Sequence, residues 1–162
     1  MRFFHMIDIF LSRPTYIPPE QEGGISGFYA LLKAMDLNPR TLGTTDYPVS
    51  APLNEVLRML DECSAMIVLG VSQISAKTGT LKGKKIKKPL KLATEWNQIE
   101  AALAYSQKKP LLIIHDKGIS RGIFDRGALT GFIHESDFND EKWYTKKEIM
   151  GALLSWKKLF AK

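Results

Sequence analysis

Short apolar runs alternate along the chain with longer segments in which apolar residues recur every three or four positions. The runs are typical of buried β-strands and the longer segments of amphipathic helices. We expect strands at residues 6–13, 40–44, 64–72, 109–116 and 131–137. We expect helices at residues 25–37, 53–63 and 145–160, and one that contains Glu100. Strands separated by helices favour a parallel sheet covered on both faces.

The size and composition fit one globular domain. The chain has 162 residues, of which 44% are hydrophobic and 25% charged, so it can bury a core of its own. We expect a single domain over residues 1–162. No apolar run approaches the ~20 residues of a bilayer span. The N-terminus reads as a first strand instead of a signal peptide, and a lone Cys63 gives no internal disulfide. We therefore expect a cytoplasmic protein.

In a parallel sheet of this kind, ligands bind beyond the carboxyl ends of the strands, near the point where the strand order reverses. The loops that follow the predicted strands are therefore candidates for the site. They begin at Ser12, Thr44, Ser72, Asp116 and Asp137.

Positive charge is concentrated in one segment. The formal net charge is +6, and residues 81–91, LKGKKIKKPLK, contain six lysines. Such a net charge suggests anionic partners. A block of like charges is usually a mobile, solvated loop. The alternative is a basic flap over an anionic ligand or partner.

The segment ATEWNQIEAALAYSQKKPLLII, residues 93–114, predicts a helix followed by a strand, with a carboxylate among apolar side chains. At about 100° per residue, the apolar residues on the same face as Glu100 are Trp96, Ile99, Leu103 and Ala104. The residues expected to face away are Asn97, Gln98 and Tyr105. A carboxylate in such surroundings is paired or has a raised pKa, as in a catalytic acid, base or nucleophile. The alternative is a structural Glu100 that caps backbone amides or pairs with a lysine of the basic segment.

Several familiar sites are absent from the sequence. One cysteine and three widely spaced histidines, His5, His115 and His134, give no zinc-ligand spacing, and we predict no metal site. There is no Walker loop, no GxGxxG after the first strand and no GxSxG. We interpret His115, at a strand end, as a structural histidine.

Three motifs, in order, resemble Toll/interleukin-1 receptor (TIR) domains. They are DIFLSR (residues 8–13), LNEVLRMLDECSAMIVLGVS (53–72) and TEWNQIE (94–100), the last similar to the Ser-x-Trp-x-x-x-Glu segment of that family. The chain departs from the family in having Asn97 after the tryptophan and about twenty residues between Ser72 and Thr94. The resemblance implies an α/β fold, a flavodoxin-like three-layer domain with a five-stranded parallel sheet flanked by helices.

The resemblance also implies an activity. In enzymatic TIR domains the glutamate of the third motif cleaves the nicotinamide glycosidic bond of NAD, which gives Glu100 the catalytic role. The segment IEAALAYSQKKPLLII (99–114) also looks like part of the nucleoside 2-deoxyribosyltransferases, whose glutamate attacks the sugar C1′. Ala102 and Lys108 stand where that family has glycines. Both families break an N-glycosidic bond.

Other residues near the strand ends are candidates for substrate binding. Phe10, Ser12 and Arg13 follow the first strand, and the fork of Arg13 suits a phosphate. Trp96 or Tyr47 would stack on a ring, although Trp96 also fits core packing. Ser72 would donate a hydrogen bond near the sugar.

The first hypothesis is thus an NAD-consuming glycohydrolase or cyclase, similar to bacterial antiphage signalling components, with NAD as substrate and no cofactor. The second is a nucleoside or nucleotide transferase or hydrolase. The third is a non-catalytic TIR-like module that binds a nucleotide or a partner through the lysines. We expect a small-molecule nucleotide substrate, a homo-oligomer and no membrane partner. Nucleic acid is the least favoured partner, because the lysines are not interleaved with aromatic residues.

Overall fold

The computed structural model describes residues 5–162 and shows a five-stranded, all-parallel sheet in the order β2-β1-β3-β8-β9. The strands are β1 (Ile7–Ser12), β2 (Leu37–Arg40), β3 (Ala65–Gly70), β8 (Leu111–Asp116) and β9 (Ile133–Ser136). Four helices flank them: α1 (Pro19–Ala34), α2 (Pro52–Glu62), α3 (Glu95–Ser106) and α4 (Lys147–Lys157). The predicted α/β, flavodoxin-like fold is confirmed.

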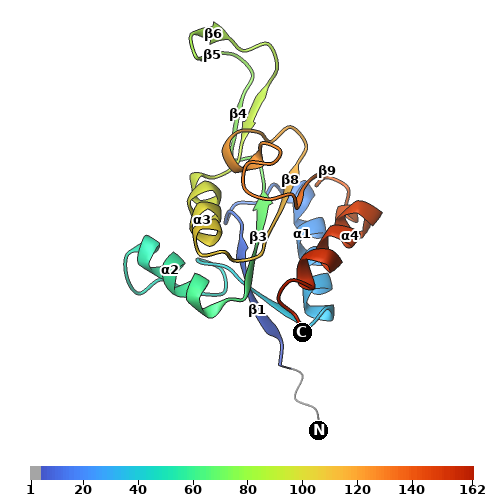
Figure 1. The fold of residues 1–162 in the computed structure, drawn as a ribbon. Coiled ribbons are helices and arrows are strands. Elements are labelled where there is room, and N and C mark those ends of the chain that lie inside the picture. The colour runs from blue at the N-terminus through green and yellow to red at the C-terminus, as the bar shows by residue number, and fades with distance from the viewer. Residues whose placement is uncertain (1–4) are drawn as a thin grey trace.

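Each face of the sheet has its own core (Figure 1). Helices α1 and α4 pack on the face reached by Ile9 and Leu11, whereas α2 and α3 pack on the face reached by Phe10. Successive side chains of a strand point to opposite faces. Ser12 therefore lies on the face of Phe10, toward α3.

The crossover from β8 to β9 has no α-helix, which corrects the expectation that a helix separates every pair of strands. Residues 117–132 contain instead the 3-10 turn η1 (Gly122–Phe124). Ile123 and Phe124 from this turn complete the core beneath α2 and α3. The segment packs so closely that a Cβ on Gly70 would lie 2.5 Å from the Phe124 ring.

Helix α1 begins six residues before its predicted start. Pro19 occupies the first turn, where a missing N–H breaks no helical hydrogen bond. Glu20 and Glu22 in the same turn stabilise the helix by interacting with the positive end of its dipole. The glycines that suggested a loop are helical because the second 3-10 turn, η2 (Trp143–Thr145), packs against them. A Cβ on Gly24 would lie 2.7 Å from Nε1 of Trp143.

Strand β2 also differs from its predicted position at residues 40–44. The strand ends at Arg40, and Thr41 to Asp46 form a turn in which three successive amides donate to the Thr41 carbonyl. Pro39 is tolerated in β2 because this strand is at the edge of the sheet.

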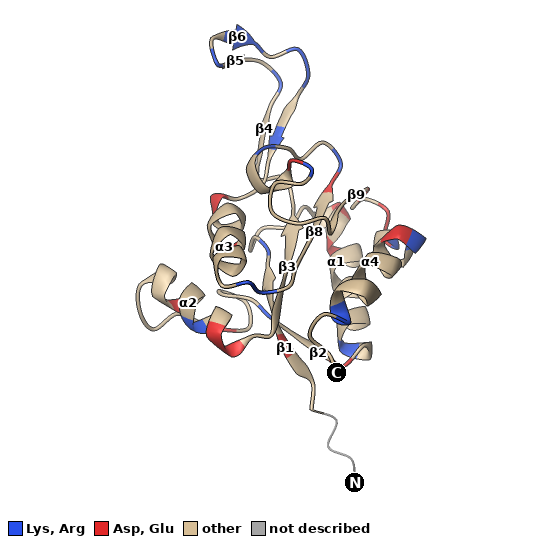
Figure 2. Ribbon diagram, viewed as in Figure 1, with Lys and Arg blue, Asp and Glu red and all other residues tan. Residues whose placement is uncertain are grey.

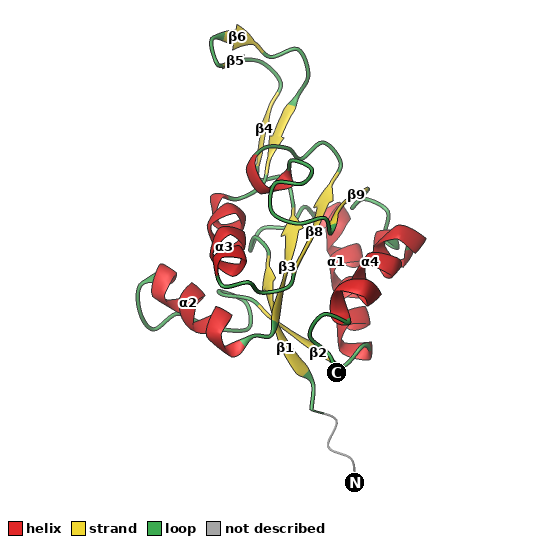
Figure 3. Cartoon of the chain, viewed as in Figure 1, coloured by secondary structure: helices red, strands yellow, loops and turns green. Residues whose placement is uncertain are grey.

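The basic segment is an antiparallel ribbon and not an irregular loop (Figure 3). Strand β4 (Ile74–Ala76) pairs with β7 (Leu90–Leu92), and β5 (Thr80–Leu81) pairs with β6 (Lys84–Lys85) at the tip. Lys82 and Gly83 have φ of 51° and 74°, as in the type I′ turn that joins hairpin strands. We call residues 74–92 the basic ribbon.

No helix within residues 5–162 is long and apolar enough to cross a bilayer.

Candidate active site

The site is built around a hydrogen bond between the first strand and the third helix. Ser12 is the last residue of β1, and Glu100 lies in the second turn of α3. The Ser12 hydroxyl donates to Oε2 of Glu100. The two residues are 1% and 7% exposed, so the contact is almost entirely shielded from solvent.

Asn97 fixes the direction of this hydrogen bond. Its side-chain amide donates to Oγ of Ser12 at 2.9 Å and to the Ser12 carbonyl at 3.3 Å. Because Oγ accepts from Asn97, the Ser12 hydroxyl hydrogen is left to point at Glu100. Asn97 is fully buried, and its Oδ1 has no protein hydrogen-bond partner. Asn97 therefore donates to Ser12, and Ser12 in turn donates to the carboxylate of Glu100.

The acidity of Glu100 is shifted toward neutrality. Burial disfavours the charged form and raises the pKa of Glu100 from 4.5 to about 7, while the hydrogen bond from Ser12 acts in the opposite direction. Near pH 7 both the carboxylate and the protonated acid are therefore populated. A carboxyl group with such a pKa can act as a nucleophile or exchange a proton.

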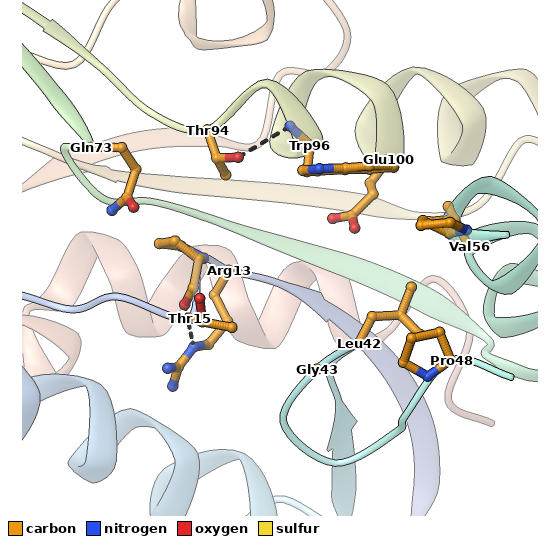
Figure 4. Close-up of a pocket in the computed structure, with 12 residues that line it drawn as sticks. Arg13, Thr15, Leu42, Gly43, Pro48, Val56, Gln73, Thr94, Trp96 and Glu100 are labelled. Atoms are coloured by element: carbon orange, nitrogen blue, oxygen red, sulfur yellow. Dashed lines mark hydrogen bonds between the residues drawn. The ribbon is translucent and has the colours of Figure 1, made fainter. Parts of the chain in front are cut away.

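Glu100 opens onto a cavity of about 300 Å³ (Figure 4). The residues that line it come from the loop after β1, the segment 42–52, α2, the base of the ribbon and α3: Arg13, Pro14, Thr15, Leu42, Gly43, Pro48, Pro52, Val56, Gln73, Thr94, Trp96 and Glu100. Among these lining residues, only Arg13 and Glu100 carry a charged side chain. The cavity is otherwise apolar or neutral, as is usual for small-molecule sites.

The cavity lies where the fold favours ligand binding. Sheet order reverses between β1 and β3, because β2 pairs with one edge of β1 and β3 with the other. The carboxyl ends of these two strands open into the crevice described for such sheets. Thr94 caps α3 by accepting from the Trp96 amide at 3.2 Å, which fixes the start of the helix that carries Glu100.

Arg40 anchors the wall formed by residues 41–51. Its guanidinium contacts Asp46 at 2.7 Å, Glu62 at 2.6 Å and Asp8 at 3.2 Å. The hydrogen bond from Arg40 lowers the pKa of Asp46, and the same contact raises the pKa of Arg40. Gly43, which lines the cavity, donates its amide to the Asp46 carbonyl at 2.8 Å. The ion-pair cluster thus connects β2 to the cavity wall.

Four of the predicted site residues meet at this place. Glu100, Arg13 and Trp96 line the cavity, and Ser12 lies behind Glu100. Arg13 makes no ion pair with any residue from 5 to 162; its Nε donates to the Pro14 carbonyl at 3.0 Å. Trp96 is 42% exposed at the rim, so it is not core packing. Glu100 pairs with Ser12 instead of with a lysine of the ribbon.

The other three lie elsewhere. Phe10 is fully buried in the core beneath α2 and does not line the cavity, because it lies two residues before the carboxyl end of β1, inside the sheet. Tyr47 is 72% exposed and is not among the residues that line the cavity, although its neighbour Pro48 is. Ser72 lies at the base of the ribbon, where its hydroxyl is 3.5 Å from the Ile74 carbonyl, and it is absent from the cavity lining.

The buried face of α3 differs from the predicted one. Asn97, expected to face away, is buried with Glu100, Ala101 and Ala104, whereas Ile99 is 40% exposed. The buried positions follow the spacing i, i+3, i+4 and i+7. The prediction gave weight to the large apolar residues, while the close approach of α3 to the sheet requires alanines. That spacing is the signal that would have identified Asn97. Sequence reasoning also missed Leu42, Pro48 and Gln73, which line the cavity. The only signal for them in the sequence was their position in predicted strands or in the loops that follow them.

Comparisons with known proteins give a relationship at the level of the fold. No family model matches the sequence, and no curated protein matches it. Among solved structures, the chain is similar to the CMP N-glycosidase BcmB of Clostridium botulinum, with 14% sequence identity and a TM-score of 0.53. The alignment covers 91% of this chain and 98% of that one. At this identity the similarity supports the α/β architecture, and the TIR resemblance rests on the sequence motifs.

Proposed function

We propose that the protein cleaves the N-glycosidic bond between a ribosyl C1′ and a nitrogen base, with Glu100 acting at C1′. The observation that carries this proposal is the buried carboxyl group of Glu100, oriented by Ser12 and open to a mainly apolar cavity. Two further observations support it. The motif TEWNQIE matches the spacing of a family that breaks such a bond in NAD, and the similar fold of BcmB belongs to an N-glycosidase acting on CMP.

The reaction places positive charge where the carboxylate is held. As the C1′–N bond breaks, its electron pair leaves with the base, and the ribosyl ring gains oxocarbenium character. The Glu100 carboxylate stabilises this charge or forms a bond to C1′. Water then adds its oxygen to C1′ and releases one proton, and Glu100 returns to its carboxylate form. Ser12, kept in place by Asn97, donates to Oε2 of Glu100 and so fixes the orientation of its carboxyl group.

The leaving group favours NAD as the substrate class. Glu100 is the only acidic side chain among the residues that line the cavity, so no second carboxylic acid is available to protonate a departing base. Nicotinamide leaves the ribosyl cation of NAD as a neutral molecule and needs no proton. A cavity of about 300 Å³, near the lower limit for ligand sites, holds one ribosyl and base unit, with the second nucleotide outside.

A nucleoside monophosphate is the second candidate, favoured by the substrate named for BcmB. A pyrimidine is a poor leaving group unless it takes up a proton. The protonated form of Glu100 would have to supply it, since the pKa of about 7 keeps that form populated at neutral pH. Arg13, which lines the cavity and makes no ion pair with another described residue, would bind the phosphate of either substrate.

The test is incubation of the purified chain with NAD and, separately, with a panel of nucleosides and nucleoside monophosphates, with products followed by chromatography and mass. We expect release of nicotinamide that falls at least about 100-fold in Glu100→Gln. The matched control is Glu95→Gln, an exposed residue on the same helix, which should retain full activity.

The pH profile separates the two substrate classes. Cleavage of NAD requires the carboxylate, so its rate should rise with pH through about 7, the pKa of Glu100. Cleavage that depends on protonated Glu100 should fall over the same range. No turnover of any substrate by folded protein would contradict the enzymatic proposal and favour a non-catalytic nucleotide-binding module. A homo-oligomeric state and a role in bacterial defence, implied by the TIR resemblance, remain predictions.

A further inference from the structure

The basic ribbon accounts for the positive charge of the whole protein. Residues 74–92 contain seven lysines and no acidic residue, and the whole chain has a formal charge of +6, so the rest of the chain has −1. Figure 2 shows these basic residues at the tip and along the ribbon, which projects away from the sheet. The excess positive charge of this protein is therefore concentrated on one protrusion.

The ribbon lysines are available to a partner. Six of them are exposed: Lys77, Lys82, Lys84, Lys85, Lys87 and Lys88. None of them forms an ion pair with another described residue. Lys91 differs, because it is half-buried and its backbone bridges to Ile119 at the base of the ribbon. Six uncompensated charges on a structure this narrow repel one another unless an anion lies against them.

The chemistry of the ribbon fits phosphates better than a protein surface. Protein interfaces are enriched in aromatic residues and arginine and depleted in lysine, whereas residues 74–92 contain lysine and neither aromatic residues nor arginine. The absence of aromatic rings also removes the stacking platforms on which single-stranded bases bind. Leu81, beside the tip turn, is the one large apolar side chain exposed there and only to 36%, so the described tip offers little apolar surface to a bilayer.

The shape of the ribbon fits a duplex. Two strands about 4.8 Å apart, with their side chains, make a ribbon that enters the major groove of B-form DNA, which is about 12 Å wide. Of the exposed lysines, Lys77 lies on the first arm, Lys82 in the turn, and Lys84, Lys85, Lys87 and Lys88 on the second arm. Positive charge thus extends around the turn from one arm to the other, so a ribbon inside a groove brings lysines toward the phosphates on both sides. A flat anionic surface would contact one side only.

We propose that the basic ribbon binds duplex DNA by inserting into the major groove and contacting the phosphates on both sides. Contacts by lysine alone, without arginine, position a protein on the backbone and carry little sequence information. The binding is thus independent of base sequence. It does not depend on the proposed catalytic function, although Gln73 and Thr94, which flank the ribbon, both line the cavity.

The test is fluorescence anisotropy of the full chain with a short labelled DNA duplex of mixed sequence, titrated at several salt concentrations. Release of counterions from up to six phosphate contacts predicts a slope of roughly −3 to −5 in log K against log salt. Replacing the six exposed ribbon lysines by glutamine should weaken binding at least ~10-fold and flatten the slope.

A matched variant controls for net charge. It replaces six exposed lysines outside the ribbon by glutamine: Lys33, Lys108, Lys142, Lys147, Lys158 and Lys162. This variant should bind the duplex within about threefold of the unmodified chain, since it removes the same charge but leaves all the ribbon lysines in place. Circular dichroism checks that both variants fold.

Three results would overturn the proposal. The first is equal loss of binding in the two variants, which would indicate net charge and not the ribbon. The second is tighter binding to single-stranded DNA or to an RNA duplex, whose deep major groove excludes a ribbon. The third is tighter binding to vesicles rich in phosphatidylserine. None of these results bears on whether Glu100 cleaves a glycosidic bond.

Discussion

Glu100 combines two properties that normally oppose one another, burial and a stable orientation as a carboxylate. Burial alone would neutralise it, and the directed hydrogen bond from Ser12 retains part of its acidity. The outcome is a pKa of about 7, close to neutral pH, where a general acid or base acts most effectively. A catalytic role for Glu100 therefore implies a cost in stability.

We expect Glu100→Gln to stabilise the fold above neutral pH. The folded pKa, about 7, exceeds the ordinary value of 4.5, so the folded state binds the proton more tightly than the unfolded state. The resulting stabilisation is complete below pH 4.5 and is lost as the pH rises to about 7. Above that pH the buried carboxylate should cost on the order of 3 kcal/mol, which the amide avoids.

Urea unfolding of both proteins between pH 4 and pH 8 measures this difference. The gain of the variant over the unmodified chain should appear between pH 4.5 and 7 and level off above. A difference that does not change with pH would show that Glu100 titrates normally.

Asn97 acts on the site through Ser12, as a positioning residue. In Asn97→Leu, which keeps the branched shape of the side chain, the Ser12 hydroxyl loses the donor that directs it toward Glu100. The carboxylate should then lose part of its hydrogen bond, and the pKa of Glu100 should rise above that of the unmodified protein. A carbon-13 NMR titration of the Glu100 carboxyl group measures this shift without requiring a substrate.

Gln98→Leu is the control for Asn97→Leu. Gln98 is the next residue on the same helix, and its side chain bonds to the backbone of Arg121 and Ile123, away from Glu100. Its replacement should leave the pKa of Glu100, measured in the same NMR titration, unchanged. If the pKa of Glu100 is unchanged in Asn97→Leu but raised in Ser12→Ala, Asn97 contributes only to packing and does not position Ser12.

At the scale of elements, the segment 41–51 depends on an ion-pair cluster at its start. Arg40→Lys keeps the charge but cannot reach Asp8, Asp46 and Glu62 together, because lysine lacks the planar fork. We expect a loss of about 2 kcal/mol in the free energy of unfolding. We also expect faster hydrogen exchange in residues 41–51 and a higher KM with an unchanged pH profile.

The pH dependence and a second variant check the cause. Arg40 lowers the pKa of Asp46 and of Glu62, so its stabilising effect is present above the ordinary carboxyl pKa values and is lost as the pH falls below about 4. Arg58→Lys, at a 40% exposed side chain of α2, should change stability little. Equal effects of the two variants would contradict an anchoring role for Arg40.

Elements defined by periodicity were predictable, and those defined by tertiary contact were not. The runs around Met66 and Ile113 are apolar on both faces and lie in the centre of the sheet. The early start of α1 depends on contact between Gly24 and Trp143, which are distant in sequence. Asn97 was missed for a different reason: its spacing with Glu100, Ala101 and Ala104 was visible in the sequence, but alanines and not large side chains mark the buried face of α3.

At the scale of the whole molecule, the sheet order places the site and the ribbon on the same edge. Glu100, Ser12 and Arg13 were chosen as candidates from strand ends and a helix motif, and the structure places them at or beside one cavity. The wall at Leu42 and Pro48 was not predictable, because loop conformation depends on the Arg40 cluster. The ribbon was predictable in charge but not in structure, since strands of two or three residues give little periodic signal.

The closed base of the ribbon has a consequence for protein engineering. The amide of Gln73 donates to the Leu92 carbonyl at 2.8 Å, and Ile74 pairs with Leu92, so the chain leaves and re-enters the domain at one point. Residues between Ala76 and Leu90 contribute nothing to either core. The ribbon can therefore be replaced without changing either core. A hairpin of different length or specificity, grafted at Ala76 and Leu90, would redirect the protein to a new target beside the same cavity.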